Sequence, residues 1–248
     1  MSPWCSAKSN KMNQNKVLRG LKQGAVWEVK EKDVQGQSFQ SWLQVVVKPG
    51  IEEIELYMPR GFTLYNFPEI KTPIPSGKYL QLKFLSVFAF PGSTFDFLSL
   101  VSFLHACPSL ETFVMDVSYC RFIVPLLNCE WVSIFTDPSD LRTMPMYRHD
   151  KLKNVQFVAF IHARQYIEFA CHFLEFATSL ERFTLNTIYG MTRCCVSKTG
   201  KCRSITKFEV TRSEASALAI ERYVRPKAPS TVLLNVWGPC SSCHADLL

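Results

Sequence analysis

The sequence lacks the features that mark exported and glycosylated proteins. Its N-terminal stretch MSPWCSAKSNKMNQNK contains no apolar run that could serve as a signal peptide, and no Asn-x-Ser/Thr acceptor occurs anywhere in the 248 residues. We therefore expect an intracellular protein, in the cytoplasm or nucleus, whose ten cysteines are reduced thiols rather than disulfides.

The motifs of the common enzyme classes are also missing. There is no G-x-G-x-x-G, no G-x-S-x-G and no H-E-x-x-H. Gly200-Lys201 resembles the end of a phosphate-binding loop, but the next residue is Cys202, which lacks the hydroxyl group that would hold magnesium. Acidic pairs such as Glu52 and Glu53 fit a solvated strand edge better than acid–base chemistry. We expect no catalytic residue, no cofactor and no enzymatic activity.

Charged side chains are nearly absent from one long segment, Phe84 to Leu110, which contains only Asp96 and His105 as exceptions. A Pro-Gly-Ser turn at 91–93 divides it into two pieces, each too short to cross a bilayer. We therefore expect this segment to be buried in a core, and we expect no membrane partner.

Positive charge exceeds negative charge, with 28 Lys and Arg against 21 Asp and Glu. The excess lies mainly in the N-terminal leader and in a segment from Arg193 to Arg212. Neither region interleaves its charges with aromatic side chains in the way that stacks nucleic-acid bases. A solvated tail and a solvated loop are the better interpretation, and no nucleic-acid partner is expected.

An internal repeat is the most informative feature that the sequence does contain. LKFLSVFAF at 82–90 aligns without gaps with LKNVQFVAF at 152–160, and FLHACPSLETFVMD at 103–116 aligns with FLEFATSLERFTLN at 173–186. The shared positions are mostly apolar, whereas the second copy carries Arg164 and Glu168 where the first is uncharged. The two copies therefore predict one shared, water-soluble fold.

Each copy holds two strand signatures of the form apolar-x-x-apolar-x-apolar. They predict parallel strands at 82–87, 110–115, 152–157 and 180–185, with weaker instances at 51–56 and 205–210 that bring the total to about six strands. Helical periodicity lies between them, as in Ile167, Cys171 and Leu174. Eight residues are predicted to be buried: Leu85, Val87, Leu110, Phe113, Val155, Phe157, Leu180 and Phe183.

This spacing predicts an α/β fold, a leucine-rich-repeat solenoid with an irregular, curved parallel sheet and helices on its outer side. An ordinary α/β domain with a parallel sheet is the alternative, which the fixed spacing disfavours. Irregularity is expected because the turn position that usually holds Asn or Cys is occupied by Phe90, Ser118, Phe160 and Ile188. We expect a basic, poorly ordered leader at 1–40 and a repeat domain at 41–248 that closes in a terminal cap at about 205–248.

One local cluster near the C-terminus has the spacing of metal ligands, Cys240-Ser-Ser-Cys243-His244. It matches haem attachment, but that chemistry needs export and a pocket, and neither is indicated. Zinc bound by Cys240, Cys243 and His244 is an alternative, with Cys194, Cys195 or Cys202 completing the site. Because the second group lacks a C-x-x-C spacing, we prefer reduced thiols that pack the cap, and we expect no bound metal.

Several longer segments resemble the C-terminal leucine-rich-repeat region of plant F-box/LRR proteins, especially those of grasses. They are LKFLSVFAF, FLHACPSLETFVMDVS, LRTMPMYRHDKLKNVQFVAF, ACHFLEFATSLERFTLNT and AIERYVRPKAPSTVLLNVWGPCSSCH, with KPGIEEIELYMP and YNFP resembling an earlier repeat. The resemblance implies the substrate-recognition part of an SCF-type ubiquitin ligase receptor, in which an F-box docks a Skp1-like adaptor and the repeats bind the target.

The sequence departs from that family plan in two ways. No F-box pattern precedes the repeats, and several repeats normally found between YNFP and LKFLSVF are missing. We therefore expect a protein-binding module for a target that the sequence does not name, without direct binding to a Skp1-like adaptor. A truncated or non-functional remnant of such a receptor, with no binding role, is the alternative.

Overall fold

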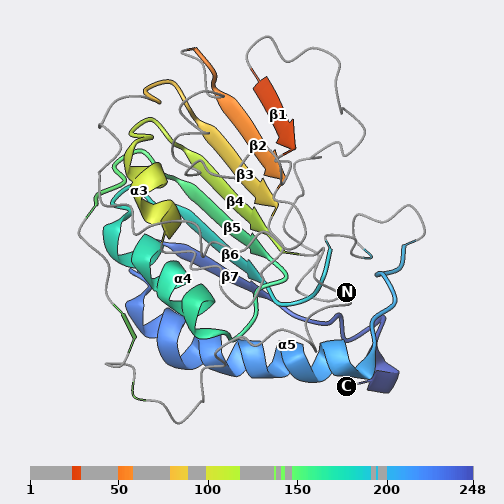
Figure 1. Cartoon of the computed structure of the whole chain (residues 1–248). Coiled ribbons are helices and arrows are strands. Elements are labelled where there is room, and N and C mark those ends of the chain that lie inside the picture. Colours follow the sequence, from red (N-terminus) through yellow and green to blue (C-terminus); the bar gives the residue numbers. More distant parts are fainter. Residues whose placement is uncertain are drawn as a thin grey trace.

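The described residues form one parallel sheet of seven strands, with helices α3, α4 and α5 against one of its faces (Figure 1). The computed structural model describes residues 24–28 (backbone only), 50–57, 79–88, 99–117, 137, 141–142, 147–190, 194 and 200–247. The strands are β1 (Gly24–Glu28), β2 (Glu53–Tyr57), β3 (Phe84–Phe88), β4 (Thr112–Asp116), β5 (Asn154–Val158), β6 (Arg182–Asn186) and β7 (Leu233–Trp237). The helices in the described parts are α3 (Ser99–His105), α4 (Arg164–Phe176) and α5 (Lys207–Ala219), followed by the helical turns η6 (Ile220–Val224), η7 (Arg225–Lys227) and η8 (Ala245–Leu247).

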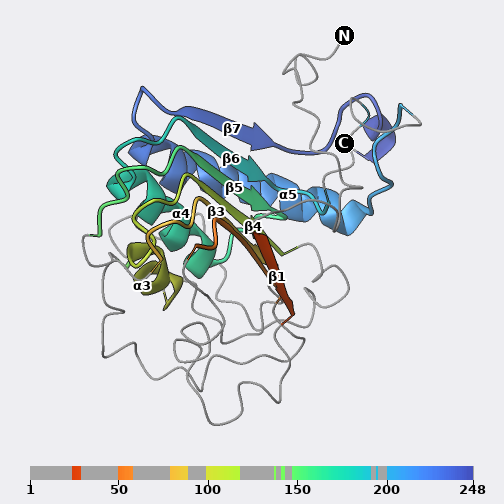
Figure 2. The same cartoon turned by 90° about the horizontal axis from the view of Figure 1, so that it is seen from above.

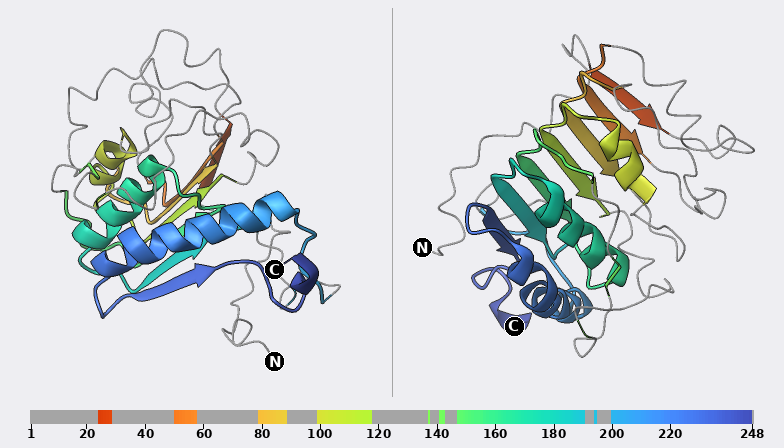
Figure 3. Two further views of the ribbon diagram at one scale, coloured as in Figure 1. Left: turned by 90° about the horizontal axis from the view of Figure 1, so that it is seen from below. Right: turned by 90° about the vertical axis from the view of Figure 1, so that its left-hand side faces the viewer.

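The order of the strands distinguishes a solenoid from an ordinary α/β domain. Each strand pairs in parallel with the strands before and after it in the chain, and the order runs from β1 to β7 without a crossover. Phe84 pairs with Thr112 and Asn154 with Arg182, an offset of 28 residues in both pairs. Helices α3, α4 and α5 all lie against the same face of the sheet (Figures 2 and 3). A doubly wound domain places helices on both faces, so the predicted solenoid is confirmed.

The core is built from the alternate strand residues that point toward the helices. Two rows of these residues cross the sheet in register, and in strands β2 to β6 every member of both rows is at most 1% exposed. The rows are Ile54, Leu85, Phe113, Val155 and Phe183, and Leu56, Val87, Met115, Phe157 and Leu185. Phe157 of β5 lies at the centre, because its ring contacts those of Phe113, Phe160, Phe169, Phe173 and Phe183. The largest part of the apolar stabilisation therefore comes from β4 to β6 and α4.

The four strong strand signatures are confirmed, with each strand beginning two residues and ending one residue later than predicted. The leucine that opens each signature lies just before its strand and is buried, and all eight residues predicted to be buried are at most 5% exposed. From β2 to β5, one carbonyl before each strand accepts two N–H groups of the next coil, as Lys83 does from Glu111 and Thr112, and before β6 the Glu181 carbonyl accepts one, from Leu233. This repeated contact fixes the position at which each strand begins.

The predicted strand at 205–210 is wrong, because this segment opens helix α5. Thr206 is the N-cap, its hydroxyl accepts the N–H of Glu209, and the Glu209 carboxylate accepts the N–H of Thr206. This capping box sets a helix start that the apolar pattern did not reveal. The last strand is instead β7, and a further strand, β1, lies within the first forty residues, where we expected only a polar leader.

A buried carboxylate connects the segment at 141–142 to helix α4. The Glu168 side chain is fully buried and accepts hydrogen bonds from the backbone N–H of Arg142 and from the Nε atoms of Arg142 and Arg164, each at 2.9 Å. Both arginines remain partly exposed, so their charges keep contact with water while the carboxylate is satisfied inside. None of the helices in the described residues has the length and apolar character that a membrane crossing requires.

Candidate functional site

The face of the sheet opposite the helices is the first candidate site, and we call it the open face. Its residues alternate with the core residues along each strand. From β2 to β7 they form three rows: Glu53, Phe84, Thr112, Asn154, Arg182 and Leu233; Glu55, Ser86, Val114, Gln156, Thr184 and Asn235; and Tyr57, Phe88, Asp116, Val158, Asn186 and Trp237.

The open face mixes aromatic, aliphatic and hydrogen-bonding side chains. Phe84, Val114 and Gln156 are partly exposed, and Leu233 is 57% exposed at the β7 edge. Four other residues of this face are at most 5% exposed: Ser86, Val158, Thr184 and Asn186. The rings of Tyr57 and Phe88 stack with their centroids 4.3 Å apart. Such a surface can bury apolar area against a partner while its amide and hydroxyl groups set the orientation.

The end of β6 is shaped by polar side chains that direct the chain away from the sheet. Asn186 donates its side-chain amide to the Gly190 carbonyl at 3.0 Å and accepts the Ile188 N–H on its oxygen at 3.3 Å. Gly190 has φ of 72°, which is strained for residues with a Cβ. This turn leads the chain from β6 toward Cys194.

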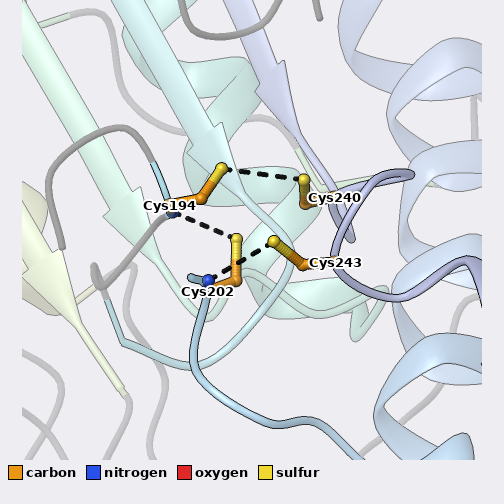
Figure 4. A group of neighbouring side chains, drawn as sticks. All are labelled: Cys194, Cys202, Cys240 and Cys243. Carbon is orange, nitrogen blue, oxygen red and sulfur yellow. Dashed lines mark hydrogen bonds between the residues drawn. The ribbon is translucent and has the colours of Figure 1, made fainter. Parts of the chain in front are cut away.

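A group of four cysteines lies beyond the ends of β6 and β7. Cys194 and Cys202 belong to the segment between β6 and α5, and Cys240 and Cys243 follow β7. Because β6 and β7 are parallel neighbours, the segments that leave them start at the same edge of the sheet. All four Sγ atoms lie within 4.8 Å of one another, and Figure 4 shows the four side chains gathered around one space.

Hydrogen bonds to sulfur connect the two halves of this group. The N–H of Cys194 donates to Sγ of Cys202 at 3.2 Å, and the N–H of Cys202 donates to Sγ of Cys243 at 3.5 Å. Sγ of Cys194 lies 3.9 Å from Sγ of Cys240. Partial burial opposes the thiolate of Cys240, but backbone N–H groups of Cys243 and Ser242 outweigh it and lower the pKa of Cys240 to about 7. The neighbouring Cys202 thiol has its pKa raised to about 12 by burial and by its thiol neighbours.

The structure separates His244 from these sulfur atoms. Its ring Nε2 lies 3.0 Å from the carbonyl of Arg203, so this nitrogen donates to that carbonyl. The backbone N–H of His244 donates to the carbonyl of Cys240, also at 3.0 Å. Of the residues that the sequence placed together, Cys240 and Cys243 meet Cys194 and Cys202, whereas Cys195 lies outside the described residues. The expectation of a cap without metal stays a prediction.

Comparison with protein families shows which family the chain belongs to. Residues 69–241 match the family model described as At1g61320/AtMIF1, LRR domain, and this match spans more than half of the chain. The chain belongs to the At1g61320/AtMIF1 leucine-rich-repeat family. No curated protein and no solved structure matches it significantly. Membership in the At1g61320/AtMIF1 family agrees with the strand order and confirms the leucine-rich-repeat region that the sequence suggested.

The residues matched by the At1g61320/AtMIF1 model include most of the open face and three of the four cysteines. Strands β3 to β7 with their open-face residues lie inside residues 69–241. Cys194, Cys202 and Cys240 lie inside this range as well, whereas Cys243 lies two residues beyond it. The sequence had left open which of Cys194, Cys195 and Cys202 joins Cys240 and Cys243.

Proposed function

We propose that this At1g61320/AtMIF1-family domain binds a protein partner through its open face. Leucine-rich-repeat solenoids present extended concave surfaces that bind proteins, so the family match supports an interaction role. The observation that carries the proposal is the partial exposure of Phe84, Val114 and Gln156 on three adjacent strands, with Phe84 one row away from the other two. Aromatic and aliphatic side chains surrounded by amides are the usual composition of a protein interface.

The finer proposal is that the partner is a substrate of an SCF-type ubiquitin ligase. It is supported by the segments that resemble plant F-box/LRR proteins, in which the repeats hold the target. Recognition of a target requires only the repeat surface, because each coil contributes side chains independently of a separate adaptor-docking element. A non-binding remnant of such a receptor is the competing hypothesis.

A matched pair of substitutions tests the binding face. Val114→Arg places a charge at the middle of the open face, whereas Leu218→Arg places the same charge on α5, where Leu218 is 58% exposed on the helix side. Proteins that the wild-type chain retains from plant extract would be identified, purified and titrated against all three chains. We expect at least about a tenfold weaker Kd for Val114→Arg, equivalent to about 1.4 kcal/mol, and an unchanged Kd for Leu218→Arg.

The outcomes separate the hypotheses. Equal affinities for the two variants would show that the open face is not the binding surface. If Val114→Arg weakens the binding of none of the retained proteins, the hypothesis of a non-binding receptor remnant is favoured. A Skp1-like adaptor is titrated in the same assay, and micromolar or tighter binding by the 248-residue chain would contradict our expectation that it does not dock this adaptor.

A further inference from the structure

We propose that Cys194, Cys202, Cys240 and Cys243 bind one structural zinc ion that fastens the C-terminal end of the solenoid. A tetrahedral zinc with Zn–S distances of about 2.3 Å holds its sulfurs about 3.8 Å apart. The Cys194 and Cys240 sulfurs are already 3.9 Å apart, and all four lie within 4.8 Å. Each sulfur would have to move by only about half an ångström to reach zinc-binding distance.

The ligand set points to zinc through its chemistry as well as its distances. Four thiolates are the donor set of closed structural zinc sites, in which no position is left for water or substrate. Backbone N–H groups already point at the sulfurs of Cys202 and Cys243, and such hydrogen bonds stabilise thiolates and orient metal ligands. One zinc ion would replace up to four thiol protons, which pass to the solvent, and would leave a net charge of −2 beside the basic segment that contains Lys201 and Lys207.

The position of the site explains what the ion would stabilise. Between β6 and α5, Ile205 is the only buried apolar side chain among described residues 194 and 200–206, and it lies outside the main apolar core, so little packing holds this segment. The ion would connect this segment to the tail after β7, across 46 residues of chain between Cys194 and Cys240. It would therefore close the last coil in the place where a solenoid needs a cap.

His244 has a supporting role in this arrangement rather than a ligand role. Its ring is buried and bonded to the Arg203 carbonyl, one residue after Cys202, and its backbone is bonded to Cys240. It thus connects the two chain segments that carry the thiols. This geometry replaces the Cys/Cys/His set considered from the sequence with a set of four cysteines.

The test measures metal content directly and does not depend on any binding partner. The full chain is purified in reducing buffer with zinc supplied, freed of excess metal, and analysed by elemental mass spectrometry. We expect about one zinc per chain, and cobalt substitution should give the absorption of a tetrahedral thiolate complex. Cys194→Ser and Cys240→Ser should each lose most of the bound zinc, and zinc removal should lower the melting temperature of the wild-type chain.

Matched controls use cysteines outside the group. Cys107→Ser and Cys171→Ser remove thiols that are buried in the core, and His244→Gln removes the ring beside Arg203. All three should keep about one zinc per folded chain. Loss of zinc only in His244→Gln, stoichiometric iron in place of zinc, a metal-free chain with four reactive thiols, or two disulfides under reducing conditions would each overturn the proposal.

Discussion

A pair of buried histidines should make the domain sensitive to mild acid. His149 and His172 are 6% and 2% exposed, and their rings lie 5.6 Å apart among the rings of Phe173 and Phe176. Neither ring nitrogen of His172 has a hydrogen-bond partner among the described residues. Burial, with a smaller contribution from His105, lowers the pKa of His149 to about 4, and burial next to His149 lowers the pKa of His172 to about 3.

Whether acid lowers or raises the stability depends on which state, folded or unfolded, binds protons at the higher pH. In the unfolded chain both histidines titrate near 6.5, so between pH 6.5 and about 4 the unfolded state holds more protons than the folded one. The contribution of the two neutral histidines to the free energy of unfolding is therefore fully present above pH 6.5 and is lost as the pH is lowered. At pH 5 each histidine is about 1.5 pH units below its unfolded pKa, which corresponds to a loss of about 2 kcal/mol per residue. The pair would remove about 4 kcal/mol from a total that is commonly about 5–15 kcal/mol.

Urea unfolding followed by circular dichroism at several pH values between 7.5 and 5.0 measures this loss. His172→Phe removes one titrating ring, fits among the neighbouring phenylalanines and leaves no unsatisfied ring nitrogen. We expect it to match or exceed wild-type stability at pH 7.5 and to lose about 2 kcal/mol less at pH 5. The cysteine group is the same in both chains, so its own pH dependence cancels in the comparison.

Leu180→Val provides the control, because it weakens the core without changing a titratable group. Its free energy of unfolding should lie below that of the wild type by a similar amount at every pH. The reasoning is refuted if His172→Phe loses as much stability as the wild type between pH 7.5 and 5.0, since His172 would then not be held neutral by burial.

Substitutions at three positions test the repeat core, the buried ion pair and the helix cap by urea unfolding at pH 7.5. Leu180→Ala should lower the free energy of unfolding by about 2–5 kcal/mol, because Leu180 is 5% exposed, and an unchanged value would contradict its burial. Glu168→Ala should lower it by about 2–3 kcal/mol through lost charged hydrogen bonds, with the two partly exposed arginines returning to water; a change below about 0.5 kcal/mol would show that the bonds contribute little. Thr206→Ala should cost about 1 kcal/mol and Thr206→Ser much less, and equal losses would argue against a capping role for the hydroxyl.

The sequence predicted the central fold well because two signals agreed there. At 82–116 and 152–186 the apolar pattern specifies which strand residues face the helices, and the repetition of the pattern specifies the spacing of the coils. Both depend on local periodicity, which is readable without tertiary information. The strand at 205–210 was mistaken because apolar residues at 205, 208 and 210 fit a strand, while the Thr206 and Glu209 capping box was overlooked.

The composition of the cysteine group was only half predictable. Cys240 and Cys243 have the spacing of a local ligand pair, so the sequence identified them. Cys194 and Cys202 are eight positions apart, and they meet the other pair only because parallel β6 and β7 end at the same edge of the sheet. The role of His244 depended on a contact with the Arg203 carbonyl, which sequence spacing does not encode.

The sequential strand order also determines how this protein should open and close. Every coil is stabilised by its own packing and by its two neighbours, so unfolding can begin at either end and advance coil by coil. Because of the aromatic cluster around Phe157, we expect β5, β6 and α4 to exchange their amide hydrogens with solvent more slowly than the other elements. Fraying at β7 would separate the two cysteine pairs while this central region stays folded. The C-terminal coil is therefore a local unfolding unit whose closure a bound ion could control without altering the rest of the solenoid.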